Sequence, residues 1–259
     1  MKRVEKTEVL RGVEMILKTE NLSIAFGGVR AVDKVDLVIE QNDIHALIGP
    51  NGAGKTTFFN LVSKYLKPDE GRVIFKGRDI TSLEPYQICR LGMSRSFQKV
   101  SVYPRLTVFE STQMSVLSHR GRALSLLRPA NNMFREETME ILEAVGIVDR
   151  AHVLGNNLSH GDKRRLDLAI TLGNQPEFLL LDEPTAGMSP EETIATTQLI
   201  QELARTRGLT VLFTEHDMSV VFGIAKRITV LHQGAVIADG KPEELKANKQ
   251  VQKIYLGEE

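Results

Sequence analysis

The chain has 259 residues, of which 42% are hydrophobic, so it can form one large globular domain or two small ones. Its 33 basic and 33 acidic residues cancel, and no charge excess indicates a nucleic acid or an acidic lipid surface as a partner. The single cysteine, Cys89, excludes a disulfide within the chain and fits a reducing compartment.

The N-terminal residues 1–14 are expected to form a short extension outside the main domain. They alternate charged with apolar residues and lack the continuous apolar core of a signal peptide. No apolar run in the chain approaches the roughly 18 residues that a membrane-spanning helix needs. A function at a membrane would therefore require other chains to span the bilayer.

Short runs rich in Val, Ile and Leu alternate with helical patterns, which indicates an α/β domain. In the first part of the chain, a helix is predicted at 56–66 after a glycine-rich loop, and Pro and Gly mark a turn at 68–71. Strands are predicted at 16–25, 35–40, 44–48, 73–75 and 93–96.

From about residue 108 to 157 the strand signals become rare and apolar residues recur at helical spacing, which predicts an inserted helical subdomain at about 99–173. Within it, the arginine-containing stretch 118–132 is interpreted as a loop or a short lid. Strand and helix signals alternate again from residue 178 onward. Strands are predicted at 178–182, 210–213 and 227–231, with a long helix at 190–205.

The strand at 44–48 runs directly into a loop with the complete Gly-x-x-x-x-Gly-Lys-Thr spacing of a nucleotide phosphate-binding loop. Backbone N–H groups of such a loop, together with the N-terminus of the next helix, bind phosphate oxygens. Lys55 supplies a positive charge for the β and γ phosphates, and Thr56 supplies a hydroxyl ligand for Mg²⁺. The residues predicted to bind nucleotide here are Gly49, Pro50, Asn51, Gly52, Ala53, Gly54, Lys55, Thr56 and Thr57.

Two adjacent acids, Asp182 and Glu183, end an apolar strand and are followed by Pro184. In ATPases with this type of phosphate loop, an Asp at that position binds Mg²⁺ through water. The neighbouring Glu can orient or deprotonate the attacking water. The pair therefore predicts a metal ligand at Asp182 and a catalytic base at Glu183.

The stretch Leu158–Ser159–His160–Gly161–Asp162, hereafter the signature turn, lies between the phosphate loop and the acidic strand. This order of motifs resembles the ATPase subunits of ABC transporters, and the resemblance runs from about Met15 to the C-terminus. It implies a P-loop NTPase (RecA-like) core of α/β type, with an antiparallel β subdomain and an inserted α-helical subdomain.

The resemblance assigns further landmarks. Phe26 matches an aromatic residue that stacks on adenine, and Gln98 matches a glutamine at the hinge between two lobes that contacts Mg²⁺ and the γ-phosphate. Residues 185–189 match the loop after the acidic strand. His216 matches the switch histidine, which contacts the γ-phosphate.

The signature turn departs from the family pattern at two positions, His160 and Asp162. Ser159 and Gly161 are retained, and in the family their hydroxyl and N–H groups contact the γ-phosphate of a partner subunit. Ser159 and Asp162 also have the spacing of a capping box that opens a helix at 163–172. We therefore expect Asp162 to turn toward the helix cap, while the turn still serves the partner's ATP.

The resemblance also implies partners and location. A second ATPase subunit, identical or different, is needed to complete each ATP site, and two transmembrane permeases would rest on the helical subdomain. A solute-binding protein outside the membrane would act indirectly. ATP and Mg²⁺ are the implied ligands, and the expected location is the cytoplasmic face of the inner membrane, as a peripheral subunit.

Three short sequence segments indicate one branch of the family. Residues 103–108, 214–218 and 251–258 resemble the ATPases of high-affinity branched-chain amino acid uptake. The Ser-His-Gly form of the signature turn is similar to that of urea uptake ATPases, and the C-terminal end is also similar to that of lipopolysaccharide-export ATPases. Import of a small polar solute such as a branched-chain amino acid is therefore the expected function, with urea import and lipopolysaccharide export as alternatives.

Soluble ABC ATPases that do not transport are a further alternative. Those acting on ribosomes usually carry two cassettes and a charged linker, whereas this chain has one cassette and no charged run. Those acting on DNA place a long coiled coil between the two halves, for which the segment between Gln98 and Phe178 is too short. No nucleic-acid partner is expected.

Overall fold

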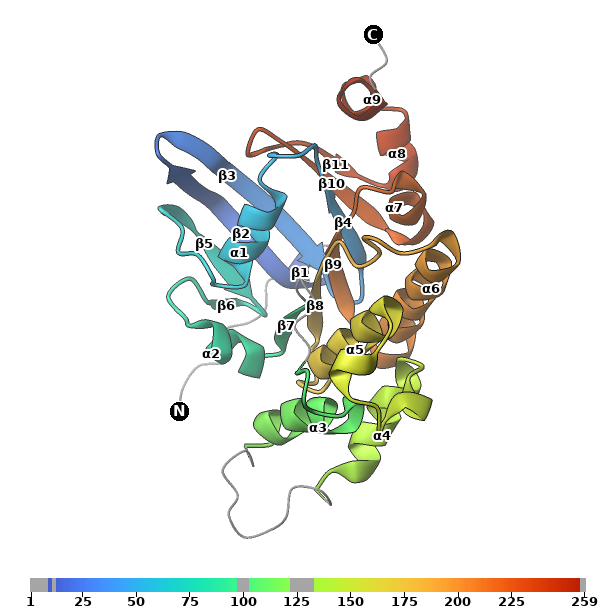
Figure 1. The fold of residues 1–259 in the computed structure, drawn as a ribbon. Helices are drawn as coiled ribbons and strands as arrows, with labels where there is room; N and C mark the ends of the chain where they lie inside the picture. The colour runs from blue at the N-terminus through green and yellow to red at the C-terminus, as the bar shows by residue number, and fades with distance from the viewer. Residues whose placement is uncertain (1–8, 11–12, 97–102, 122–132, 257–259) are drawn as a thin grey trace.

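A computed structural model of the chain describes residues 9–10, 13–96, 103–121 and 133–256. Within this part, the strands form two sheets, and most helices lie on the side of the larger sheet away from the smaller one or beyond its ends (Figure 1). Two hydrophobic clusters hold the layers together, one on each face of the larger sheet. No helix in the described ranges is both long and apolar enough to cross a bilayer.

The smaller sheet is antiparallel. Its longest strands, β2 and β3, form a hairpin whose turn uses Gly27 and Gly28, both with positive φ. In the described residues the order is β1-β2-β5-β6, with β3 also paired to β2. The strands are β1 (Val9–Leu10), β2 (Val13–Phe26), β3 (Val29–Glu40), β5 (Glu70–Phe75) and β6 (Arg78–Asp79).

The larger sheet has the order β11-β10-β4-β9-β8-β7 among the described residues. All neighbours are parallel except β10 and β11, which are antiparallel. Every residue of β4, β8 and β9 is buried, because helices or the smaller sheet cover both faces. The strands are β4 (Ile44–Ile48), β7 (Met93–Ser96), β8 (Phe178–Asp182), β9 (Thr210–Thr214), β10 (Arg227–His232) and β11 (Ala235–Gly240).

The two faces of this sheet carry different helices. Leu180 and Leu212 pack with Phe58 and Phe59 of α1 (Lys55–Val62), whereas the alternate strand residues pack with α5 and α6. Because successive side chains of a strand point to opposite faces, α1 lies on one face and α5 and α6 lie on the other. The larger helices on that second side are α5 (His160–Leu172), α6 (Pro190–Arg207) and α7 (Met218–Ile224).

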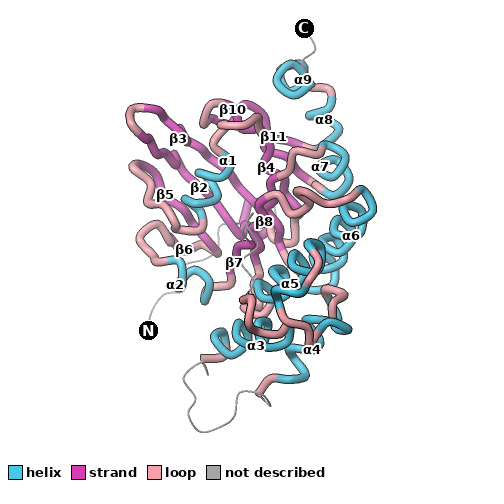
Figure 2. Tube along the Cα trace, in the orientation of Figure 1, coloured by secondary structure: helices cyan, strands magenta, loops and turns pink. Residues whose placement is uncertain are grey.

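Between β7 and β8, the described residues contain helices and no strand. Figure 2 shows α3, α4 and α5 gathered at one end of the molecule, away from the smaller sheet. The helical elements of this segment are α3 (Val108–His119), α4 (Arg135–Ala144), α5 and two short 3₁₀ turns, η2 (Val148–Arg150) and η3 (Gly155–Asn157). Most of residues 118–132, including the expected loop or lid, lie outside the described residues.

The strands expected at 44–48, 93–96 and 178–182 agree with β4, β7 and β8 residue for residue. The helix expected at 56–66 ends earlier, at Val62. There Ser63 donates its hydroxyl to the Phe59 carbonyl, and Lys64 takes a positive φ of 63°, which turns the chain out of the helix.

Other elements differ from those expected or were not expected at all. The strand expected at 35–40 begins earlier, at Val29, because its pairing with β2 continues to the hairpin turn. Part of the expected extension 1–14 joins the smaller sheet, since β1 pairs with the start of β2. The unexpected elements are β6, β11, α2 (Pro85–Arg90), α7, α8 (Pro242–Lys246) and α9 (Lys249–Leu256).

Candidate functional site

The phosphate loop, residues 49–56, connects the buried strand β4 to α1 and depends on its glycines. Gly54 has a φ of 104° and is the N-cap of α1, a left-handed conformation that favours glycine. A Cβ atom there would collide with the carbonyl oxygen of Ala31, and one at Gly49 would collide with the carbonyl oxygen of Leu231. The backbone itself therefore approaches its neighbours too closely for any side chain at these positions.

Lys55 lies in this loop with only 7% of its surface exposed. Its Nζ donates hydrogen bonds to the Gly49 carbonyl at 2.5 Å and to the Pro50 carbonyl at 3.2 Å. Burial lowers the pKa of Lys55, and the negative charges of Glu183 and Asp182 oppose that shift. The lysine, both acids and the N-terminus of α1 thus meet at one place, where a phosphate group can replace the loop carbonyls as partner of Nζ.

The carboxylate of Asp182, at the end of β8, is 5% exposed and accepts hydrogen bonds on both oxygens. Thr214 Oγ1 donates to Oδ1 at 2.9 Å, and Arg95 Nη2 donates to Oδ2 at 3.0 Å. Arg95 also donates to Asn60 Oδ1 at 2.7 Å and to Ser63 Oγ at 3.0 Å. These bonds hold the carboxylate in one orientation beside the phosphate loop.

Glu183 follows with a positive φ of 51°, which turns its side chain away from the direction of the strand. Its N–H lies 3.1 Å from both the carbonyl oxygen and Oγ1 of Thr214. Its Oε1 lies 3.0 Å from Nε2 of His216, whose side chain is 47% exposed. The structure therefore brings together the two residues that the sequence analysis expects to act at the γ-phosphate.

The signature turn overlaps the start of a helix, because its last three residues belong to α5. Helix α5 begins at His160, so Ser159 is its N-cap and accepts a hydrogen bond from the Asp162 N–H at 3.1 Å. Of the expected capping box, the described residues contain this half and not the reciprocal bond, in which the Ser159 N–H would donate to the Asp162 carboxylate. Ser159 and His160 are exposed. Because α5 and α1 lie on opposite faces of the larger sheet, Ser159 is separated from the phosphate loop of its own chain.

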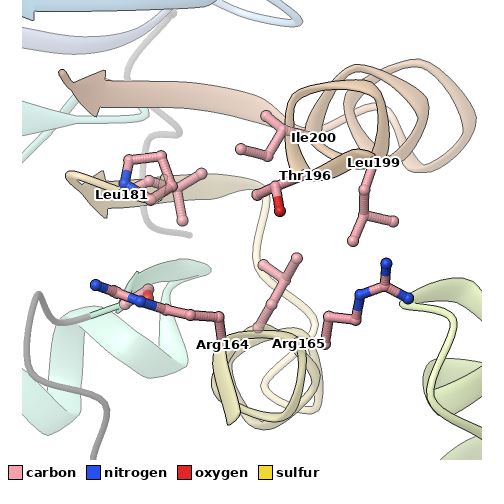
Figure 3. A pocket seen from close by; sticks show the side chains of 9 residues that line it. Arg164, Arg165, Leu181, Thr196, Leu199 and Ile200 are labelled. Carbon is pink, nitrogen blue, oxygen red and sulfur yellow. The ribbon is translucent and has the colours of Figure 1, made fainter. Parts of the chain in front are cut away.

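A small pocket of about 30 Å³ lies between α5 and α6 (Figure 3). Arg164 and Arg165 of α5 line one side, and Thr196, Leu199 and Ile200 of α6 line the other. Arg165 donates to the Gly146 carbonyl at 3.0 Å, at the end of the turn after α4. This bond turns the Arg165 side chain toward the body of the protein.

Two further residues were predicted from the sequence, Phe26 and Gln98. Phe26 ends β2 with 49% of its surface exposed, in a position free to contact a flat ligand. Gln98 lies outside the described residues. Ser96, two residues before it, donates a hydrogen bond to Asp167 of α5, which links the end of β7 to the helical segment. Burial raises the pKa of Asp167, and the Ser96 hydrogen bond opposes that shift.

Arg95, Thr214 and Glu215 were not among the site residues predicted from the sequence. Arg95 and Thr214 bind Asp182, and Glu215 is a buried carboxylate that accepts from the N–H and the hydroxyl of Thr185. Only one of the three had a usable signal: Glu215 directly precedes His216 at the end of an apolar strand, as Asp182 and Glu183 do. The other two contacts come from strands that are distant in sequence.

A larger groove of about 310 Å³ lies between the core, α2 and α5. Its lining includes Tyr65, Cys89, Tyr103 and Asn174. Tyr65 and Tyr103 are 55% and 46% exposed, so two aromatic rings border the groove. Groove-lining aromatics with a polar tip are common where another protein docks.

Comparisons with known proteins agree with this arrangement. Residues 32–186 match the protein family described as ABC transporter, and residues 235–259 match the family described as branched-chain amino acid ATP-binding cassette transporter. Over 252 residues, the chain is 40% identical to the high-affinity branched-chain amino acid transport ATP-binding protein LivG of Salmonella typhimurium, covering 94% of this chain and 98% of that protein.

Solved structures show the same fold. The crystal structure of the ADP conformation of an ATP-binding cassette of an ABC transporter has a TM-score of 0.83 and 30% identity, covering 94% of this chain and 99% of that chain. A dimeric post-hydrolysis cassette bound to ADP and Pi has a TM-score of 0.75 and 25% identity, with coverages of 87% and 98%.

Proposed function

This chain belongs to the ABC transporter family of ATP-binding proteins, and we propose that it powers the import of branched-chain amino acids. Membership makes it a nucleotide-binding ATPase. The observation that carries the cargo assignment is the match of residues 235–259 to the branched-chain amino acid family, together with the 40% identity to LivG. Urea import and lipopolysaccharide export are the alternatives.

The roles of the site residues follow from their geometry. Lys55, released from the Gly49 and Pro50 carbonyls, would bind the β and γ phosphates, and Phe26 would stack on the adenine. Glu183 would accept a proton from the attacking water. His216, 3.0 Å from Glu183, would hold that carboxylate and contact the γ-phosphate.

Mg²⁺ fits the donor set of this site. Thr56 and Asp182 offer hydroxyl and carboxylate oxygens, which this cation prefers. Both Asp182 oxygens already accept hydrogen bonds from protein groups, which favours binding through a water over direct ligation. Gln98 would be a further ligand. When bound, the ion supplies charge that offsets the phosphates.

We further propose that two subunits pair to complete each ATP site. Ser159 and Gly161 lie across the sheet from their own phosphate loop, so their hydroxyl and N–H groups are available to the nucleotide of a partner. His160 and Asp162 would lie at the same interface. The dimeric cassette at 25% identity supports this pairing, and the partner would be a second copy or a related ATPase.

The groove between the core, α2 and α5 would receive a segment of a transmembrane permease, one for each ATPase. The protein would then be peripheral, at the cytoplasmic face of the inner membrane. A solute-binding protein outside the membrane would deliver the cargo to the permeases without touching this chain. The helical segment at about 99–173 would transmit ATP binding to that groove.

Reconstitution of the chain with its permeases and solute-binding protein in vesicles tests the proposal. We expect ATP-dependent uptake of leucine, and loss of uptake with Glu183→Gln while ATP binding persists. Uptake of urea in place of leucine would support the first alternative, and release of lipopolysaccharide from the membrane would support the second. ATP hydrolysis with no response to any permease would contradict a transport function.

A further inference from the structure

Thr214, which ends β9, and the next two residues contact the end of β8 and the segment that follows it. Thr214 donates to Asp182 at 2.9 Å and accepts from the Glu183 N–H at 3.1 Å. His216 lies 3.0 Å from the Glu183 carboxylate. Thr214 and His216 therefore act directly on the two acids, and the residue between them, Glu215, has a different target.

Glu215 is 4% exposed, and its carboxylate connects two loops. Its Oε1 accepts from the Thr185 N–H at 2.8 Å and from the Thr185 hydroxyl at 2.6 Å, while Oε2 lies 3.2 Å from the His216 N–H. Thr185 is itself only 6% exposed. A buried carboxylate that accepts several hydrogen bonds holds its donors firmly, because losing one partner leaves a charge without compensation.

The segment that begins at Thr185 ends against the signature turn of the same chain. A Cβ atom on Gly187 would lie 3.9 Å from Cε1 of His160. Farther along, Ser189 and Glu192 form the capping box that opens α6, and a Cβ atom on Gly161 would lie 2.9 Å from Oε1 of Glu192. Two separate contacts thus place residues 187–192 beside the signature turn.

We propose that Glu215 is a positioning residue that couples the switch histidine to the signature turn, by fixing residues 185–189 to the backbone of His216. The proposal rests on the function proposed above, in which His216 serves the subunit's own ATP and Ser159 serves the ATP of its partner. Glu215 holds the first residue of the segment, whose far end meets the signature turn. We call the hydrogen bonds that Glu215 accepts from Thr185 and from the His216 N–H the Glu215 clamp. With this clamp in place, His216 and residues 185–189 move as one unit.

The chemistry requires a carboxylate at this position. Among the described residues, Glu215 accepts from three donors: two N–H groups and one hydroxyl. A glutamine would keep one acceptor oxygen and direct its NH₂ group at an N–H of Thr185 or His216. Glu215→Gln is therefore nearly isosteric, yet it breaks one side of the clamp.

Steady-state hydrolysis and ATP binding by the full-length chain test the proposal. We expect Glu215→Gln to lower kcat by about tenfold or more and to leave the dissociation constant for ATP within about twofold, because the phosphate loop is intact. Thr185→Val, which replaces the hydroxyl by a methyl group, should lower kcat by about threefold or more. Thr185→Ser, which keeps the hydroxyl, should have the kcat of the wild type. Glu202→Gln, an exposed acid on α6, is the matched control and should behave as wild type.

The double variant Glu215→Gln/Thr185→Val should be no more than about twofold slower than Glu215→Gln alone, since both changes open the same clamp. Wild-type kcat in Glu215→Gln, a loss confined to ATP affinity, or an additive double variant would overturn the proposal. If Glu215→Gln fails to fold, Thr185→Val and Thr185→Ser decide it. A wild-type protein that binds no ATP would refute the proposed function itself, which separates the two failures.

Discussion

Protonation of His45 is expected to destabilise the folded protein below neutral pH. His45 lies on β4 with 0% exposure, and its Nε2 is 2.7 Å from Oγ1 of Thr229. The Thr229 hydroxyl donates to Asp239 at 2.9 Å, so His45 must donate from Nε2, and Nδ1 carries no proton. Among the described residues Nδ1 has no hydrogen-bond partner, and a proton there would lack an acceptor in the core.

The size of the effect follows from the two protonation equilibria. Burial lowers the pKa of His45 from 6.5 to about 4. Between these values the unfolded chain binds a proton that the folded protein does not, so stability is complete above about pH 6.5 and falls as the pH decreases toward 4. For this shift, linkage predicts a loss of about 2 kcal/mol in the free energy of unfolding between pH 7 and pH 5.

Urea denaturation at pH 7 and pH 5 measures that loss. His45→Gln keeps a donor for Thr229 but does not titrate, so its free energy of unfolding should fall by about 2 kcal/mol less than that of the wild type over this interval. His152, which is exposed, provides the control, and His152→Gln should follow the wild type. Equal pH dependence in His45→Gln and the wild type would refute the reasoning.

Three further changes test the site. Gly54→Ala should abolish nucleotide binding, measured with a fluorescent ATP analogue, because its Cβ meets the Ala31 carbonyl; binding of wild-type strength would contradict that geometry. His216→Ala should retain ATP binding and lower kcat by about 100-fold, and unchanged turnover would leave His216 a structural role. Arg95→Met should lower the free energy of unfolding by about 3–5 kcal/mol, because it leaves the Asp182 charge buried and unpaired. Asp182→Asn in that background should recover part of the loss, and a further loss would argue against the ion pair.

The sequence predicts the strands and helices correctly where a short stretch of residues carries the pattern by itself. The strands at 44–48 and 178–182 are continuous apolar runs because both faces of the larger sheet are covered. The strand Ala235–Gly240 was missed, since it lies at the edge and most of its residues are only half-buried, which weakens the apolar pattern. The short helices at the C-terminus were missed as well.

The sequence by itself determined the residue types at fixed spacing: the phosphate loop, the two acids at and just after the end of β8, and the Ser159 cap. Each depends on atoms within a few residues of one another, where backbone geometry leaves little freedom. Only the tertiary structure decided which groups orient these residues. Arg95 and Asp182 are 87 positions apart, and Thr185 and Glu215 are 30 apart. Those pairs meet because parallel strands bring their carboxyl ends to one edge of the sheet, an alignment that no local pattern specifies.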